Sequence, residues 1–163
     1  MATDHNQYLG NPLLKKANVP VEFTKEQIQE YQKCMDDPIH FIQEHMKIVS
    51  LDEGLVPFKM YDFQQNMVKT FHDNRFTICK LPRQSGKSTT IIAYLLHYVL
   101  FNPNVNVAIL ANKSSTARDI LGRLQLGYEN LPKWLQQGVI SWNKGSLDLE
   151  NGSSILAAST SAS

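Results

Sequence analysis

The run FTICKLPRQSGKSTTII, residues 76–92, decides the fold class of this chain. An apolar, β-like stretch (Phe76–Leu81) leads into a short polar loop that closes on Gly86-Lys87-Ser88, and an amphipathic, helix-like segment follows at once. In this arrangement the backbone N–H groups of the loop and of the helix N-terminus point at phosphates, where the helix dipole favours negative charge. The run therefore predicts a site for a nucleoside triphosphate, in which Lys87 reaches the β- and γ-phosphates and the Ser88 hydroxyl ligates Mg²⁺.

The loop departs from the usual phosphate-binding pattern. Leu81 stands five positions before Gly86, where the pattern has glycine, and the loop interior carries Pro82, Arg83 and Gln84 instead of a glycine-rich turn. The alternative is an ordinary surface turn, because Gly-Lys-Ser tripeptides also occur by chance in turns. The predicted strand before the loop and the predicted helix after it favour the phosphate-binding interpretation.

The composition is that of one globular domain with a real core. The chain has 163 residues, 42% hydrophobic and 19% charged, with a net charge of +1. There is no global basic field, so any DNA contact must be local or be supplied by parts outside this sequence. The longest apolar-rich stretch, Ile91–Phe101, is too short to cross a bilayer, which predicts no membrane partner.

Cysteines and histidines give no sign of a metal site. Cys34 and Cys79 are predicted to be reduced, buried thiols of a cytosolic protein, with a disulfide as the alternative. The five histidines show no metal-ligand spacing to one another or to cysteine. They are His5, His40, His45, His72 and His97.

Three parts are predicted along the chain. Residues 1–22 form an extended N-terminal arm, residues 23–75 a small helical subdomain, and residues 76–163 the first part of an α/β core. Thr24 and Gln27 form a capping box at the first helix, and Asp37-Pro38 starts the second. The elements expected further along are helices at about 61–73, 87–101 and 115–129 and strands at 76–81, 105–111, 139–142, 146–149 and 155–158.

The alternation of strand and helix after residue 75 predicts the fold class. Strand, helix, strand, helix implies a parallel sheet with right-handed crossovers. We therefore expect an incomplete P-loop NTPase-type parallel sheet with flanking helices. The last two strands are separated by Glu150-Asn151-Gly152, which is a hairpin turn signal.

Arg83 is a candidate catalytic residue. An arginine three residues before the loop glycine lies near the γ-phosphate, where an arginine finger in cis raises the rate by a factor on the order of 10³–10⁵. A solvent-facing arginine that binds phosphate only in the ground state, or that pairs with a carboxylate, fits the sequence equally well.

Gln64 is a candidate for reading the base. A glutamine in the helix upstream of a phosphate loop can present its amide bidentately to the adenine edge, as in DNA readout. Tyr61 and Phe63 are placed to stack on the same base. The alternative, favoured if Gln64 is considered alone, is a polar residue on the exposed side of an amphipathic helix.

The residues that hydrolysis requires are not found downstream. A phosphate-loop ATPase needs an acidic residue at the end of a later apolar strand to hold Mg²⁺ and a carboxylate to activate water. No stretch of four apolar residues ending in Asp-Glu follows residue 88, and the downstream acids are Asp119, Glu129, Asp148 and Glu150. We therefore expect the hydrolytic half of the site to be absent from this chain.

With these residues in view, the chain resembles the large terminase subunit of tailed bacteriophages, most closely the T4-like branch. The resemblance rests on LPRQSGKST, on YDFQ upstream (residues 61–64) and on WNKGSLDLENGSSILAAST downstream (residues 142–160). It spans about residue 11 to residue 163. The family's deviant Walker A motif, x-R-Q-x-G-K-[ST], corresponds here to Pro82–Ser88.

The resemblance implies an ATP-driven motor that packages double-stranded DNA into the procapsid, and in the full-length family also an endonuclease. It implies ATP and Mg²⁺ as ligands, with Arg83 and Lys87 catalytic and Ser88 on the metal. The portal protein and the small terminase subunit are implied partners, in a homo-oligomeric ring at the procapsid portal in the host cytoplasm. The helical subdomain would cover the nucleotide. The implied nucleotide-binding residues are Gln64, Pro82, Arg83, Gln84, Ser85, Gly86, Lys87, Ser88 and Thr89.

The family's Walker B strand, coupling motif and nuclease domain have no counterpart in the sequence. We therefore expect an N-terminal portion that binds ATP weakly and does not hydrolyse it alone. The alternatives are a fragment of a helicase-like or restriction-type DNA translocase, and an inert or complementing binding fragment. The translocases usually keep a loop ending in Gly-x-Gly-Lys-Thr, which this chain lacks.

Overall fold

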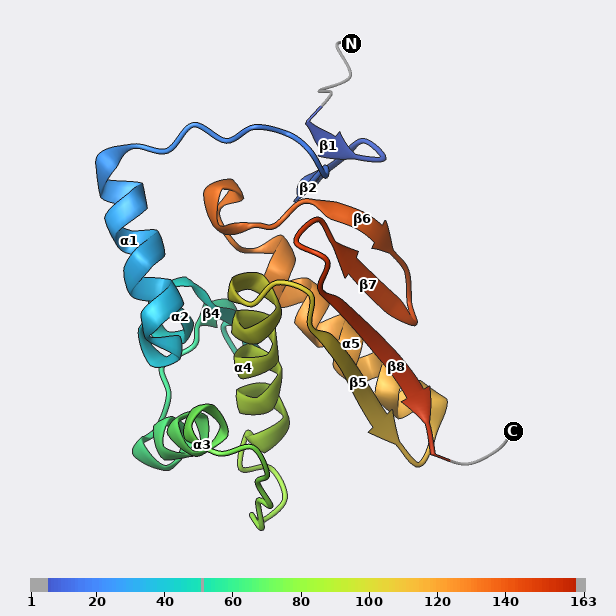
Figure 1. Ribbon diagram of the computed structural model, residues 1–163. Coiled ribbons are helices and arrows are strands. Elements are labelled where there is room, and N and C mark those ends of the chain that lie inside the picture. Colours follow the sequence, from blue (N-terminus) through green and yellow to red (C-terminus); the bar gives the residue numbers. More distant parts are fainter. Residues whose placement is uncertain (1–5, 51, 161–163) are drawn as a thin grey trace.

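The computed structural model describes residues 6–50 and 52–160, and within them the chain forms five α-helices, one 3-10 helix and eight short strands (Figure 1). The helices are α1 (Lys25–Asp36), α2 (Pro38–His45), α3 (Asp62–Asp73), α4 (Lys87–Phe101), α5 (Ser114–Glu129) and the 3-10 helix η1 (Lys133–Leu135). The strands are β1 (Gln7–Tyr8), β2 (Asn11–Lys15), β3 (Lys47–Ser50), β4 (Gly54–Pro57), β5 (Asn106–Ala111), β6 (Val139–Trp142), β7 (Ser146–Leu149) and β8 (Ser154–Ser159). None of these helices combines the length and the apolar character needed to span a membrane.

The first two helices begin where their capping residues predict. The Thr24 hydroxyl accepts the Gln27 N–H at 3.2 Å, and the Gln27 side chain accepts the Thr24 N–H at 3.0 Å. At the start of α2 the Asp37 carboxylate accepts two backbone N–H groups, and Pro38 occupies the first turn. Both predicted starts are confirmed, because the signals that set them are local.

The main sheet is mixed, with strand order β5-β8-β7-β6. Only β5 and β8 are parallel; β7 pairs antiparallel with both β8 and β6. The sheet is therefore mixed and not parallel as predicted, because two of its three strand pairings are antiparallel. The reason is the turn at Glu150-Asn151-Gly152, where Gly152 has φ of +82°, because a short turn can join only antiparallel neighbours.

Residues 76–81 do not form a strand, although their apolar pattern predicts one. The segment is irregular, and the side chains of Phe76 and Ile78 are 84% and 98% exposed. A strand is held by hydrogen bonds to a neighbouring strand, and no described residue pairs with this segment. The same exposure corrects the prediction for Cys79, which is an exposed free thiol, whereas Cys34 is buried as expected.

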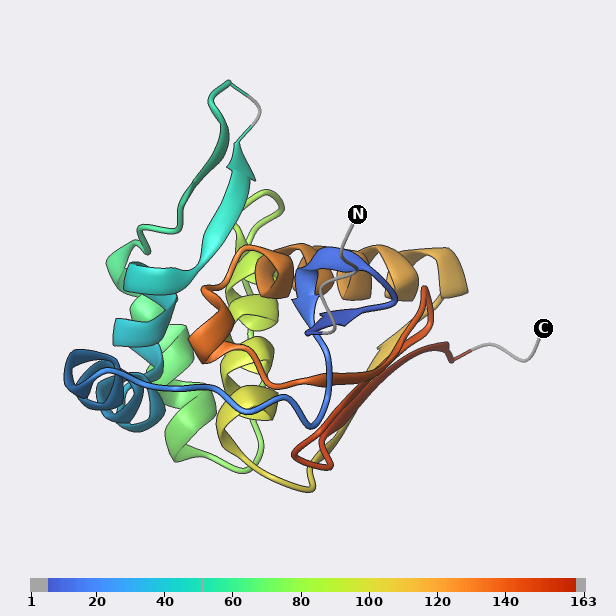
Figure 2. The ribbon, with the colours of Figure 1, turned by 90° about the horizontal axis from the view of Figure 1, so that it is seen from above.

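The core lies between the helices and one face of the sheet. Helix α4 is the central element, and its Leu96 and Leu100 are buried against α5 and α2 neighbours. Figure 2 shows α4 and α5 on the same side of the sheet, while the β3–β4 hairpin projects away from the body. Strand residues alternate accordingly: Ile109 and Ile155 face the core, and neighbouring side chains such as Leu156 remain exposed.

The N-terminal segment packs on the body. Within the range predicted to be an extended arm, β1 and β2 form a short antiparallel hairpin, and Lys16 then bridges to Val139 at the start of β6. Lys15 Nζ lies 3.1 Å from Glu150 Oε1, and the same carboxylate accepts the N–H groups of Gly138 and Asn18 at 2.7 and 2.8 Å. The chain then crosses the molecule to α1 (Figure 1).

Gln136 is the second anchor of this segment. It is 3% exposed, and its amide oxygen accepts the Lys15 N–H at 3.0 Å. Its amide nitrogen donates to the carbonyls of Leu13, Tyr128 and Leu131 at 3.0–3.2 Å. One buried side chain thus satisfies backbone groups of β2 and of the turn after α5.

Candidate functional site

Most of the residues that the sequence singles out lie in one segment, residues 82–88, which we call the GKS loop; Gln64 lies on α3 and Thr89 in the first turn of α4. The GKS loop enters α4 at its N-terminus, at the end of the molecule where the parallel strands β5 and β8 also end (Figure 1). In open α/β sheets ligands bind at the carboxyl ends of the parallel strands. The fold therefore places the GKS loop at the edge where a ligand is expected.

The N-terminus of α4 has no side-chain cap. Gly86 is the N-cap residue, with φ of +74°, and among the described residues no side chain forms a capping hydrogen bond there. The helix begins with the Thr90 N–H and hydroxyl both donating to the Gly86 carbonyl at 3.0 Å. The preceding N–H groups of the first turn are the ones that an anion satisfies at a helix N-terminus.

Gly86 and Gln64 hold the GKS loop against α3. Gln64 is 4% exposed, and its amide oxygen accepts the Tyr61 N–H at 2.9 Å while its amide nitrogen lies 3.5 Å from the Ser85 carbonyl oxygen. A Cβ atom on residue 86 would lie 2.6 Å from Gln64 Nε2. Both this contact and the left-handed backbone favour glycine at position 86. Gln64 is therefore not the exposed polar residue that the alternative interpretation required.

A pocket of about 590 Å³ opens between α3 and the GKS loop. This volume is within the range of small-molecule sites. Tyr61 and Phe63 form one wall, with their rings stacked at a centroid distance of 5.9 Å and an interplanar angle of 9°. Both rings are exposed, at 71% and 40%, so they offer an aromatic surface to a planar ligand. The lining residues are Tyr61, Phe63, Gln64, Leu81, Pro82, Gln84, Ser85 and Gly86.

Two polar groups of the GKS loop fit an anionic ligand. Lys87 Nζ folds back onto the Leu81 carbonyl oxygen at 3.2 Å, so its ammonium group lies over the loop. The Ser85 hydroxyl is buried and has no hydrogen-bond partner within residues 6–50 and 52–160. A buried hydroxyl without a partner costs free energy, and a phosphate oxygen is one group that would satisfy it.

The predicted site residues divide into three groups. Gln64, Pro82, Gln84, Ser85 and Gly86 line the pocket between α3 and the GKS loop. Arg83, Lys87 and Ser88 lie outside the pocket lining. Arg83 is exposed, and none of the ion pairs within residues 6–50 and 52–160 involves it. Lys87 and Ser88 are half-buried at the start of α4. Thr89 lies instead in a separate cleft, which also includes Lys47 and Arg123.

One contributing group was not predicted from the sequence. The carbonyl of Leu81, the residue that breaks the usual glycine pattern, accepts the Lys87 ammonium. Because any residue type offers a backbone carbonyl, no signal in the sequence identifies it in advance.

Together these features define an α/β protein with a candidate anion-binding loop between a helical part and a mixed sheet. The model of the family "Terminase large subunit, T4likevirus-type, N-terminal" matches residues 78–163, more than half of the chain. The chain belongs to this family, which is that of the terminase ATPase of tailed phages, and membership implies a role in phage DNA packaging.

Proposed function

We propose that the GKS loop binds the phosphates of ATP in complex with Mg²⁺. The observation that carries this proposal is the uncapped N-terminus of α4, entered through a glycine in the left-handed conformation, beside the buried and unpartnered Ser85 hydroxyl. Lys87 would leave the Leu81 carbonyl for the β- and γ-phosphates, and Ser88 would ligate Mg²⁺. When bound, Mg²⁺ neutralises negative charge on the phosphate oxygens. The remaining residues of the loop, with Thr89, complete the proposed nucleotide site.

We assign the base to the pocket beside the GKS loop. The stacked, exposed rings of Tyr61 and Phe63 offer a surface on which adenine can lie, and Gln64 is next to them. Both ends of the Gln64 amide already have partners in the chain, so reading the adenine edge requires Gln64 to exchange them. In this proposal the helical subdomain, residues 23–75, contributes the base site, and residues 76–163 form part of a P-loop NTPase-type core.

We propose that Arg83 acts as an arginine finger in cis. It is exposed and is held in no ion pair among the described residues, so its guanidinium is available to the γ-phosphate. Replacing Arg83 with alanine should then lower ATP hydrolysis by the assembled motor by a factor on the order of 10³ or more, with little change in ATP affinity. An equal loss of affinity and of hydrolysis would assign Arg83 to ground-state binding.

The proposed role is that of the ATP-binding part of the packaging motor. In that role the chain acts with double-stranded DNA, the portal protein and the small terminase subunit, in a ring at the procapsid portal in the host cytoplasm. Among the described strands, the parallel pair β5 and β8 is followed by Asn112 and Thr160, not by a carboxylate. We therefore expect the 163-residue chain alone to bind ATP without sustained hydrolysis.

Calorimetric titration of the chain with ATP and Mg²⁺ tests the proposal. Lys87→Ala should weaken binding by about 10- to 150-fold, which corresponds to the loss of a charged hydrogen bond. Lys80→Ala is the matched control, because Lys80 is an exposed lysine just before the GKS loop. Ser88→Ala should weaken binding in the presence of Mg²⁺ but not in EDTA. Equal affinities for the chain and for Lys87→Ala, or no binding at all, would refute the proposal and favour a fragment that acts only when complemented.

A further inference from the structure

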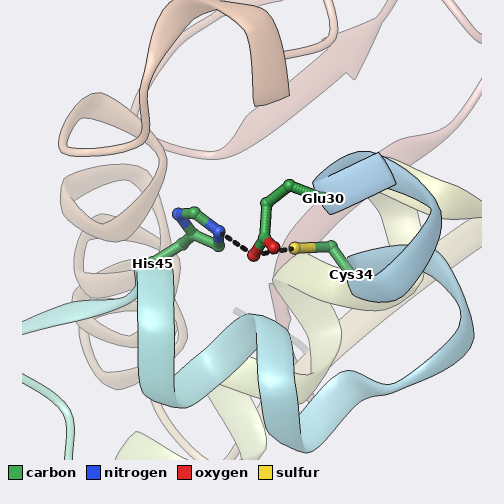
Figure 3. A group of neighbouring side chains, drawn as sticks. All are labelled: Glu30, Cys34 and His45. Carbon is green, nitrogen blue, oxygen red and sulfur yellow. Dashed lines mark hydrogen bonds and ion pairs between the residues drawn. The ribbon is translucent and has the colours of Figure 1, made fainter. Parts of the chain in front are cut away.

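A second cluster of chemically active side chains lies away from the GKS loop, where α1 meets α2. The carboxylate oxygen Oε1 of Glu30 is 2.7 Å from His40 Nε2, 2.9 Å from His45 Nε2 and 3.6 Å from Cys34 Sγ. Figure 3 shows the Glu30 carboxylate between the His45 ring and the Cys34 sulfur. Three groups that commonly ligate metals thus converge on a single oxygen atom.

The helices bring these residues together although they are not in a recognised sequence motif. Glu30 and Cys34 are four residues apart on α1 and therefore lie on one face of the helix. The Asp37-Pro38 start of α2 reverses the chain, so His45 at the end of α2 faces that surface. The spacing of 11 residues between Cys34 and His45 is set by a whole helix, which explains why the sequence alone gives no metal signal.

The ligand atoms of Glu30, Cys34 and His45 all lie within 4.8 Å of one another. A tetrahedral zinc ion with bonds of about 2.0–2.3 Å needs its ligand atoms roughly 3.3–3.8 Å apart. Adjustments of about one ångström in side chains that are already in contact would therefore complete the geometry. The three residues lie on two helices that are packed against each other.

The environment fits a metal with three protein ligands. Cys34 is fully buried, and the side chains of Glu30 and His45 are 26% and 15% exposed. The buried Cys34 thiolate would be shielded from solvent. Zinc with three protein ligands takes water as its fourth ligand, which would enter on the partly exposed side of Glu30 and His45. Thiolate and imidazole favour zinc and similar transition metals over Mg²⁺ and Ca²⁺, which prefer oxygen ligands.

We propose that Glu30, Cys34 and His45 form a binding site for Zn²⁺ that joins α1 to α2. Binding releases the Cys34 thiol proton to solvent, and the sulfur then donates an electron pair to the metal. His40 is a positioning residue: its ring nitrogen lies 2.7 Å from the same oxygen of the Glu30 carboxylate. The site shares no residue with the GKS loop, so the test of this proposal is separate from that of the proposed ATP site.

Cobalt titration of the reduced chain tests this site, because Co²⁺ substitutes for Zn²⁺ and reports its ligands in its absorption spectrum. We expect one Co²⁺ per chain, a sulfur-to-cobalt charge-transfer band, and displacement of Co²⁺ by Zn²⁺ but not by Mg²⁺. Cys34→Ser should abolish the band, and His45→Gln should lower affinity by more than the roughly 10–100-fold that loss of an outer partner costs. His40→Gln should fall within that 10–100-fold range and keep the band.

Two matched controls separate this site from adventitious binding. Cys79→Ser removes the exposed free thiol, and His72→Gln removes an exposed histidine of α3, and neither should change the affinity or the band. Circular dichroism of each variant shows whether it is folded, and His45→Gln provides the test if Cys34→Ser does not fold. Absence of one-to-one Co²⁺ binding, or equal binding by the chain and by a folded Cys34→Ser or His45→Gln variant, would overturn the proposal. The cluster would then be a hydrogen-bonded link between α1 and α2 only.

Discussion

Replacing Gly86 with alanine tests the close contact that seats the GKS loop on α3. Residue 86 has φ of +74°, a conformation that costs an L-residue roughly 1–2 kcal/mol. The new methyl group would lie 2.6 Å from Gln64 Nε2, so the Gln64 side chain must move. Its displacement breaks the hydrogen bond from the Tyr61 N–H, which contributes about 0.5–1.5 kcal/mol. Gly86→Ala should therefore lower the free energy of unfolding by roughly 1.5–3.5 kcal/mol.

Urea denaturation followed by circular dichroism measures this change, and two other glycines separate its parts. Gly54 has φ of +73° with no atom within 4 Å of an added Cβ, so Gly54→Ala should cost only the backbone strain, about 1–2 kcal/mol. Gly122 lies inside α5 with open space around it, and Gly122→Ala should be stabilising by up to about 1 kcal/mol.

A double-mutant cycle isolates the contact itself. In a Gln64→Ala background the methyl group at position 86 meets no amide, so the cost of Gly86→Ala should fall to about that of Gly54→Ala. If Gly86→Ala costs no more than Gly54→Ala in the unaltered chain, and the cycle shows no coupling, the reasoning that Gln64 and the GKS loop are in close contact is wrong.

Two further predictions concern the anchors of the N-terminal segment. Burial alone would raise the pKa of Glu150, but backbone hydrogen bonds and the Lys15 ammonium hold this pKa below its usual value. The carboxylate therefore stabilises the fold above about pH 4.5, and this stabilisation is lost as the pH falls through the lowered pKa. Glu150→Gln should thus lower the free energy of unfolding by roughly 1–3 kcal/mol near pH 7 and by much less in acid. The control Glu53→Gln, at an exposed residue, should change it little at either pH. Urea denaturation at both pH values measures these differences. Gln136→Leu leaves several buried backbone groups without partners, so it should lower the free energy of unfolding by about 2–4 kcal/mol and speed proteolysis within residues 9–18. Gln125→Leu is the control, because the exposed amide of Gln125 makes a single hydrogen bond. Limited trypsin digestion that is equally slow for both variants would contradict this role of Gln136.

The helices were predictable from the sequence because their signals are short-range. The capping box at Thr24 and the Asp37-Pro38 start depend on residues within one turn, and both occur where predicted. The turn at Gly152 was predictable for the same reason. The pairing of β8 beside β5 was not predicted, and the reversal from β7 into β8 makes the sheet mixed.

The failures concern contacts made over long distances in the sequence. Residues 76–81 have the composition of a strand, but a strand also requires a neighbour to accept its hydrogen bonds, and composition does not report one. At the candidate site the loop residues were identified from their spacing, whereas the burial of Gln64 and the acceptor role of the Leu81 carbonyl depend on how α3 packs. The cluster of Glu30, Cys34 and His45 was missed because two helices, not a motif, assemble it.

The anchoring of β2 has a consequence for how the protein acquires its fold during synthesis. Lys15 leaves the ribosome early, but its partners Gln136 and Glu150 follow 121 and 135 residues later. At translation rates of about 5–20 residues per second, this delay lasts roughly 6–27 s. For that interval Lys15 of β2 lacks its partners Gln136 and Glu150. The docking of β2 is therefore among the last events of folding, and it follows the formation of the turn between β7 and β8.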